Sequence, residues 1–189
     1  QLYKGENAYW EIPIYQRNYA WEKDEVFALI QDVFDAFNKD EKSIYYIGTL
    51  VSFYKGDNIF EIIDGQQRLT TINLILKALE IPISNPLTYR ARKKSDNTLK
   101  ALPKCAIQEQ DQGLINGYRF AENAIKEIIS NEQLESFKKY FLNNVHIIHY
   151  KVPRDIDLNH YFEIMNSRGE QLEKHEIIKA RLLATLKND

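Results

Sequence analysis

Residues 60–71 read Phe-Glu-Ile-Ile-Asp-Gly-Gln-Gln-Arg-Leu-Thr-Thr, and they place a short apolar run directly before a helical pattern. Residues 59–63 are mostly β-branched or aromatic and predict a strand, which the pair Asp64-Gly65 ends. Apolar residues then recur at helical spacing. They are Leu69, Ile72, Ile75, Leu76 and Leu79. The segment therefore predicts a strand, a turn with one glycine, and a helix.

A helix that starts directly after a strand presents unpaired N–H groups and the positive end of its dipole, which together favour an anion. Asp64 at the strand end has the chemistry to hold Mg²⁺, and Arg68 to fork onto a phosphate. Gln66 and Gln67 offer neutral donors and acceptors for a water or a phosphate oxygen. The plainer alternative is that Asp64 caps the helix and pairs with Arg68.

The rest of the chain predicts an α+β domain around this junction. Residues 45–54 and 59–63 are expected to form a hairpin through the turn 55–58, and 9–12 and 145–152 predict two more strands. Helices are expected over residues 22–38, 108–129, 132–142, 159–165 and 173–186. We expect one structural domain, with the first part of its core in 1–80, an inserted and mainly helical lobe in 81–143, and the last core strand with C-terminal helices in 144–189.

Composition excludes several classes of protein. The 189 residues are 44% hydrophobic and 12% aromatic, so the chain is not disordered, and no apolar run is long enough to span a membrane. A single cysteine, Cys105, rules out a disulfide framework and favours a cytoplasmic location. The net charge of −2 argues against an autonomous polybasic DNA-binding domain. Because the chain begins with Gln1, we expect a fragment of a longer protein.

Charge is nevertheless uneven along the chain. Residues 90–104 hold six basic residues against Asp96 alone, whereas residues 22–42 are mainly acidic. Solvated surfaces explain both stretches. The sharper alternative is that the basic stretch contacts nucleic acid or phosphate.

Two further segments are rich in polar groups, and with the central one they form a recurring pattern. We call residues 13–21 (Pro-Ile-Tyr-Gln-Arg-Asn-Tyr-Ala-Trp) the first motif, 64–71 the central motif, and 162–172 (Phe-Glu-Ile-Met-Asn-Ser-Arg-Gly-Glu-Gln-Leu) the late motif. In this order they resemble the N-terminal domain of GmrSD-type, modification-dependent (type IV) restriction and phage-defence proteins. That resemblance implies a ParB/sulfiredoxin-like fold, a small mixed sheet with flanking helices and the inserted helical lobe.

The same resemblance implies that the domain binds a nucleoside triphosphate with Mg²⁺ and hydrolyses it. It gives catalytic roles to Asp64, which would also hold the metal, and to Gln67 and Arg68. The nucleotide-binding residues that it implies are Gln16, Arg17, Tyr19, Gly65, Gln66, Thr70, Asn166 and Arg168. Implied partners are DNA, through the full-length protein, and a His-Asn-His nuclease domain or subunit. That nuclease cassette is not visible in this sequence, so we expect no DNA cleavage by this fragment.

Other sites are excluded by the residues present. The central motif has Gln66 and Gln67 where a sulfiredoxin needs a cysteine, and no Gly-x-x-x-x-Gly-Lys-[Ser/Thr] loop occurs. His146 and His149 are three residues apart on a predicted strand, so they point to opposite faces and cannot share a metal ion. The competing functional hypothesis is a non-catalytic module that senses DNA or a partner and keeps a vestigial nucleotide site.

Overall fold

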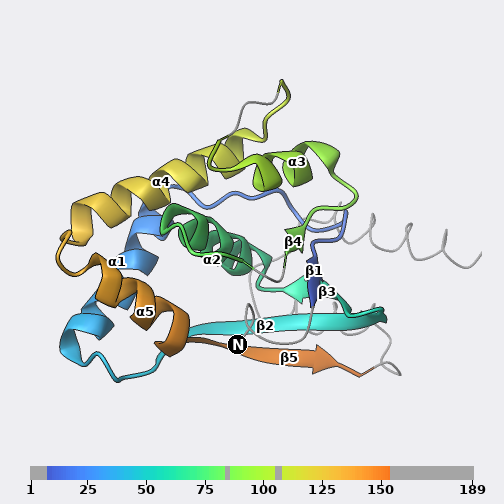
Figure 1. Ribbon diagram of the computed structural model, residues 1–189. Helices are drawn as coiled ribbons and strands as arrows, with labels where there is room; N and C mark the ends of the chain where they lie inside the picture. Colours follow the sequence, from blue (N-terminus) through green and yellow to red (C-terminus); the bar gives the residue numbers. More distant parts are fainter. Residues whose placement is uncertain (1–7, 84–85, 105–107, 154–189) are drawn as a thin grey trace, which may run out of the picture.

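The computed structural model describes residues 8–83, 86–104 and 108–153, and its centre is a five-stranded mixed sheet (Figure 1). The strand order is β4-β1-β3-β2-β5. The strands are β1 (Tyr9–Glu11), β2 (Tyr45–Gly56), β3 (Ile59–Asp64), β4 (Leu87–Thr88) and β5 (Val145–Val152). The chain is therefore an α+β domain, as its sequence predicts, and the hairpin of β2 and β3 is confirmed.

Strand direction decides where the connecting loops gather. β1 lies between β3 and β4 and runs parallel to both, whereas β2 is antiparallel to β3 and parallel to β5. The carboxyl ends of β1, β3 and β4 consequently meet at one edge of the sheet. The chain continues from these three ends into the first motif, the central motif and residues 89–92. Carboxyl ends of parallel strands are where open α/β sheets bind ligands.

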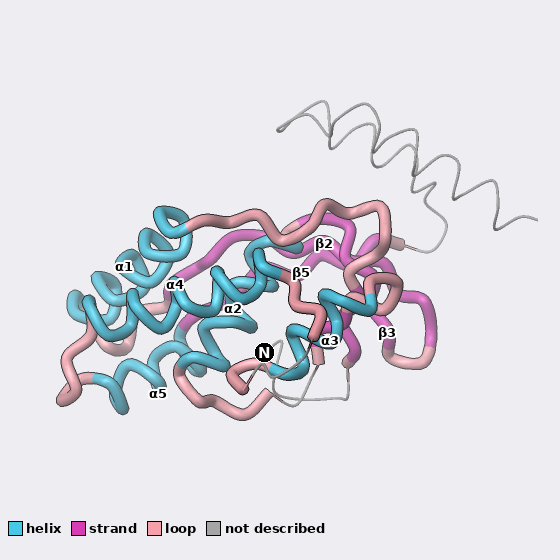
Figure 2. The backbone as a smooth tube through the Cα atoms, turned by 90° about the horizontal axis from the view of Figure 1, so that it is seen from above, coloured by secondary structure: helices cyan, strands magenta, loops and turns pink. Residues whose placement is uncertain are grey.

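In the described part of the chain five helices accompany the sheet, and Figures 1 and 2 show them gathered along one side of it. Their bounds are α1 (Lys23–Lys39), α2 (Gln66–Ala78), α3 (Lys93–Ala101), α4 (Gln112–Ile128) and α5 (Leu134–Asn144). Apolar side chains of α1, α2, α4 and α5 form one core with Ile47 of β2. A second core joins the sheet to α2, α3 and α4 through Trp10, Leu50, Leu74 and their neighbours. The described residues of the segment 81–143 contribute buried side chains to both cores.

Two elements were not predicted from the sequence, α3 and the two-residue strand β4. Only Ser95, Thr98 and Leu99 of α3 are buried, so the helix has almost no apolar periodicity to reveal it. β4 exists through its pairing with β1. Within the described ranges, no helix is long and apolar enough to cross a membrane.

Candidate functional site

The turn between β3 and α2 requires glycine for two reasons. Gly65 has a φ of 87°, which side chains rarely tolerate, and an added Cβ would lie 2.8 Å from the carbonyl oxygen of Thr49. It is the N-cap residue of α2 and supplies no side-chain cap. The first turn of the helix is thus pressed against β2, and the positive end of its dipole follows directly on Asp64.

Asp64 and Arg68 flank this turn without bonding to each other. Asp64 is exposed, and the ion pairs among the described residues do not include it. Arg68 instead folds back onto β2, where its Nη1 donates to the carbonyl oxygen of Thr49 at 2.7 Å. Its guanidinium lies over Gly48, where an added Cβ would be 2.9 Å from Nη1. The alternative in which Asp64 pairs with Arg68 is therefore wrong.

The two glutamines of the central motif bind the first motif. Gln66 Nε2 donates to the carbonyl oxygen of Arg17 at 2.8 Å, and Gln67 Nε2 donates to that of Asn18 at 2.9 Å. Gln67 Oε1 also accepts from the N–H of Ala20 at 2.9 Å. Both side chains are buried, at 5% and 8% exposure. They hold the loop beside the helix N-terminus, in place of the water or phosphate contact that their chemistry suggested.

The two threonines of the central motif each share a hydrogen bond with a buried tyrosine. Thr71 Oγ1 lies 2.9 Å from the hydroxyl of Tyr19, and Thr70 Oγ1 lies 2.8 Å from that of Tyr89. Burial raises the pKa of Tyr19 to about 12 and that of Tyr89 further still, so both hydroxyls keep their protons at neutral pH. The structure thus places Thr70 and Tyr19 in the core, where they position α2 and the first motif.

Other side chains of the first motif extend its attachment to the sheet. Gln16 Nε2 donates to the carbonyl oxygen of Ile63 at 2.6 Å, one residue before Asp64. The Tyr15 hydroxyl donates to Glu61 Oε1 at 2.9 Å, and burial followed by the charge of Glu61 raises the pKa of Tyr15. The side chain of Arg17 is exposed. The first and central motifs therefore form one unit, with Arg17, Asp64 and Arg68 at its surface.

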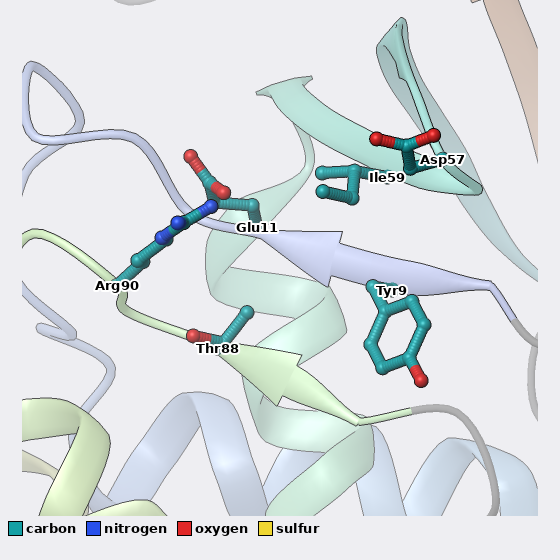
Figure 3. Close-up of a pocket in the computed structure, with 6 residues that line it drawn as sticks. All are labelled: Tyr9, Glu11, Asp57, Ile59, Thr88 and Arg90. Carbon is teal, nitrogen blue, oxygen red and sulfur yellow. The ribbon is translucent and has the colours of Figure 1, made fainter.

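A charged cluster occupies the neighbouring part of the sheet. Lys55 Nζ lies 2.8 Å from Glu11 and 2.9 Å from Glu61, and both carboxylates are nearly buried. Burial alone lowers the pKa of Lys55, but its bonds to Glu11 and Glu61 raise it above the ordinary value. Figure 3 shows Arg90 reaching toward Glu11 across a hollow of about 230 Å³. The hollow is lined by Tyr9, Glu11, Asp57, Ile59, Thr88 and Arg90, none of them a predicted site residue.

Three participants of this site were missed by sequence reasoning. Gly48 and Thr49 of β2 receive the Arg68 guanidinium, and Arg92 donates to oxygen atoms of the first motif that the glutamines do not contact. A glycine inside a predicted strand was the available sign for the first of these. Asn166 and Arg168 of the late motif lie outside the described residues, and the structure brings the first and central motifs together.

Metal binding finds limited support in the described part of the chain. It holds no group of three or more His, Cys, Asp or Glu side chains arranged to bind a metal ion. Asp64 alone is placed to contribute one carboxylate, which suits Mg²⁺ when phosphate oxygens supply other ligands. The ring of His146 packs against Tyr46, whereas that of His149 packs against Trp10. The two histidines therefore have different neighbours and do not face each other across a common site.

These features define an α+β domain whose polar motifs meet at the carboxyl ends of parallel strands. Comparison with protein families matches residues 1–183 to the GmrSD restriction endonuclease, N-terminal domain. The chain therefore belongs to that family and so to a modification-dependent restriction protein. No curated protein matches the chain.

Proposed function

We propose that this domain binds a nucleoside triphosphate and hydrolyses it, as the regulatory domain of a DNA-modification-dependent defence nuclease. The observation that carries the proposal is the β3–α2 junction. There an uncapped helix N-terminus, an exposed carboxylate at Asp64 and the guanidinium of Arg68 surround one glycine turn. A triphosphate needs these three elements, which are N–H donors, a ligand for Mg²⁺ and a cation for its terminal oxygens.

The chain's own residues would divide the work as follows. The helix N-terminus and Arg17 bind phosphate oxygens, and Asp64 holds Mg²⁺, which supplies charge neutralisation when bound. Arg68 leaves its contact with the Thr49 carbonyl and forks onto the terminal phosphate, where charge gathers in the transition state. Gln66 and Gln67 keep the first motif in place. DNA contact and cleavage belong to the full-length protein and its His-Asn-His nuclease domain or subunit.

A second candidate is a non-catalytic module that senses DNA or a partner and keeps a vestigial nucleotide site. It is favoured by one observation, that both amides and both threonines of the central motif are engaged in packing. Hydrolysis of a nucleoside triphosphate is expected of the first candidate and not of the second, so its measurement distinguishes them.

The deciding experiment measures phosphate release from each of the four nucleoside triphosphates with Mg²⁺, with and without DNA, in the full-length protein. Arg68→Ala is expected to lower turnover about a hundredfold or more, because losing a donor aimed at developing charge costs roughly 3 kcal/mol. Arg68→Lys should restore little, since an ammonium cannot hold two oxygens in parallel. Arg119→Ala, at an exposed position of α4, is the matched control. Unchanged turnover in a folded Arg68→Ala protein would leave the sensing module as the function.

A further inference from the structure

We propose that Arg92 is a positioning residue for the nucleotide site, because it binds acceptor atoms of the first-motif loop that the two glutamines do not contact. The inference rests on the proposed function. Arg92 stands immediately before α3, in the inserted segment, and none of the three motifs contains it. Its importance comes from its contacts with residues more than 70 positions earlier in the chain.

The guanidinium of Arg92 binds three acceptors of the first motif. Nη2 donates to the carbonyl oxygens of Gln16 at 2.8 Å and Pro13 at 3.2 Å, and Nη1 donates to Oδ1 of Asn18. Within the loop, the backbone bond seen among the described residues runs from the Gln16 N–H to the Pro13 carbonyl. Residues 13–18 therefore depend on side-chain donors for their conformation.

Arg92 is itself held by the central motif, through Tyr89. The guanidinium carbon lies 5.2 Å from the centre of the Tyr89 ring, and the Tyr89 hydroxyl shares its hydrogen bond with Thr70 of α2. The N–H of Arg92 also donates to the carbonyl oxygen of Tyr89. A continuous path thus runs from Thr70 through Tyr89 and Arg92 to the loop that carries Gln16 and Arg17.

The geometry explains why this position needs arginine. Two carbonyl oxygens and one amide oxygen converge on the same place, and a cation with several fixed donors offsets their mutual repulsion. Lysine carries the same charge, but its single ammonium sits at the end of a flexible stem and cannot keep this planar arrangement. Without Arg92, the carbonyl oxygens of Pro13 and Gln16 lose the guanidinium as a donor, and residues 13–16 keep the side-chain bonds of Tyr15 and Gln16 to β3. The two glutamines still hold residues 17–20. The loop is then expected to loosen at one end.

The test compares Arg92→Gln and Arg92→Lys with Arg90→Gln, an exposed arginine two residues away. Hydrogen exchange of the Gln16 amide, whose N–H is hydrogen-bonded within the loop, and of the amides of α2 is followed. The KM and kcat of phosphate release with Mg²⁺ and each nucleoside triphosphate are measured alongside. For Arg92→Gln we expect at least tenfold faster exchange in the loop, unchanged exchange in α2, and at least a tenfold rise in KM that exceeds any fall in kcat. Arg92→Lys should recover only part of this, and Arg90→Gln should match the wild type.

Loop exchange that stays at the wild-type rate overturns the inference, and so does faster exchange with an unchanged KM. If Arg92→Gln raises hydrogen exchange throughout α2, that variant has lost its fold. The same exchange and KM measurements on Arg92→Lys then test the inference. A wild-type protein that neither binds nor hydrolyses any nucleoside triphosphate overturns the proposed function. In that case the exchange data still decide whether Arg92 fixes the loop.

Discussion

At Gly48, the backbone strain that an alanine would cause can be separated from its effect on the position of the Arg68 guanidinium. Gly48 and Gly56 both lie in β2 with positive φ, of 116° and 106°, so alanine strains either one by roughly 1–3 kcal/mol. An alanine Cβ at 48 would meet the Arg68 guanidinium, whereas one at 56 would meet nothing within 4 Å. A guanidinium is the free end of a flexible side chain and will move aside.

We therefore predict that Gly48→Ala and Gly56→Ala lower the melting temperature by similar amounts, while only Gly48→Ala changes nucleotide turnover. Thermal unfolding and phosphate release in parallel provide the measurement. Equal turnover in the two variants would mean that the resting position of Arg68 has no bearing on the site.

Among the elements, β5 is attached to the sheet partly through one histidine. His149 Nε2 lies 2.7 Å from Oγ of the buried Ser52, and its ring packs edge-on against Trp10 and Phe60. Burial, then the nearby charge of Lys151, lowers the pKa of His149 below its ordinary 6.5. The folded protein therefore favours the neutral ring.

The sign of the pH dependence follows from this shift. As pH falls below about 6.5, His149 is protonated in the unfolded chain before it is protonated in the folded protein, whose pKa is lower. The contribution of His149 to the free energy of unfolding is therefore complete above pH 6.5. It decreases as pH falls from 6.5 toward the folded-state pKa. We predict that urea unfolding between pH 7.5 and 5 shows a smaller loss of stability in His149→Gln than in the wild type. His146→Gln, on the same strand, serves as the control. Parallel pH profiles for wild type and His149→Gln would contradict the prediction.

Elements differ in how far the sequence reveals them. The helix α1 was predictable because its buried residues repeat at helical spacing. The junction of β3 and α2 was predictable because a strand pattern, one glycine and a helix pattern follow each other without a gap. α3 and β4 were not, because tertiary contacts hold polar or very short segments in place.

On the scale of the whole molecule, α4 of the inserted segment packs against the first motif and α2. An alanine Cβ at Gly117 of α4 would lie 2.4 Å from Cε1 of Tyr19 and 2.9 Å from Cδ1 of Leu74. Alanine in a helix usually stabilises by about 1 kcal/mol relative to glycine. Here overpacking against the first motif costs about 1–3 kcal/mol and reverses the sign.

We accordingly predict that Gly117→Ala destabilises the protein in urea unfolding, whereas Asn123→Ala, on the exposed side of α4, does not. Tyr19 should also report the change through faster hydrogen exchange in the loop. A Gly117→Ala protein more stable than the wild type would show that α4 and the first motif are not packed this closely.

The candidate site was only partly accessible to sequence reasoning, for a reason that lies in distance along the chain. The motif residues themselves could be named from the pattern, and the family assignment agrees with that resemblance. Their partners could not be named, because Tyr19 meets Thr71 across 52 positions and Arg92 meets Pro13 across 79. The spacing of residues within a short segment does not indicate which distant residues will pair. It also cannot tell whether an amide faces a ligand or a neighbouring carbonyl.

The parallel pairing of β1 has a consequence for how the chain is made. β1 leaves the ribosome first, yet both of its neighbours, β3 and β4, are synthesised much later. At about 5–20 residues per second, the 79 positions between Pro13 and Arg92 correspond to roughly 4–16 s during which the first motif has no complete partner. The nascent domain therefore exposes Trp10, Ile12 and Tyr19 over that interval, and the first motif completes its contacts only after α2 and residues 89–92 have been synthesised.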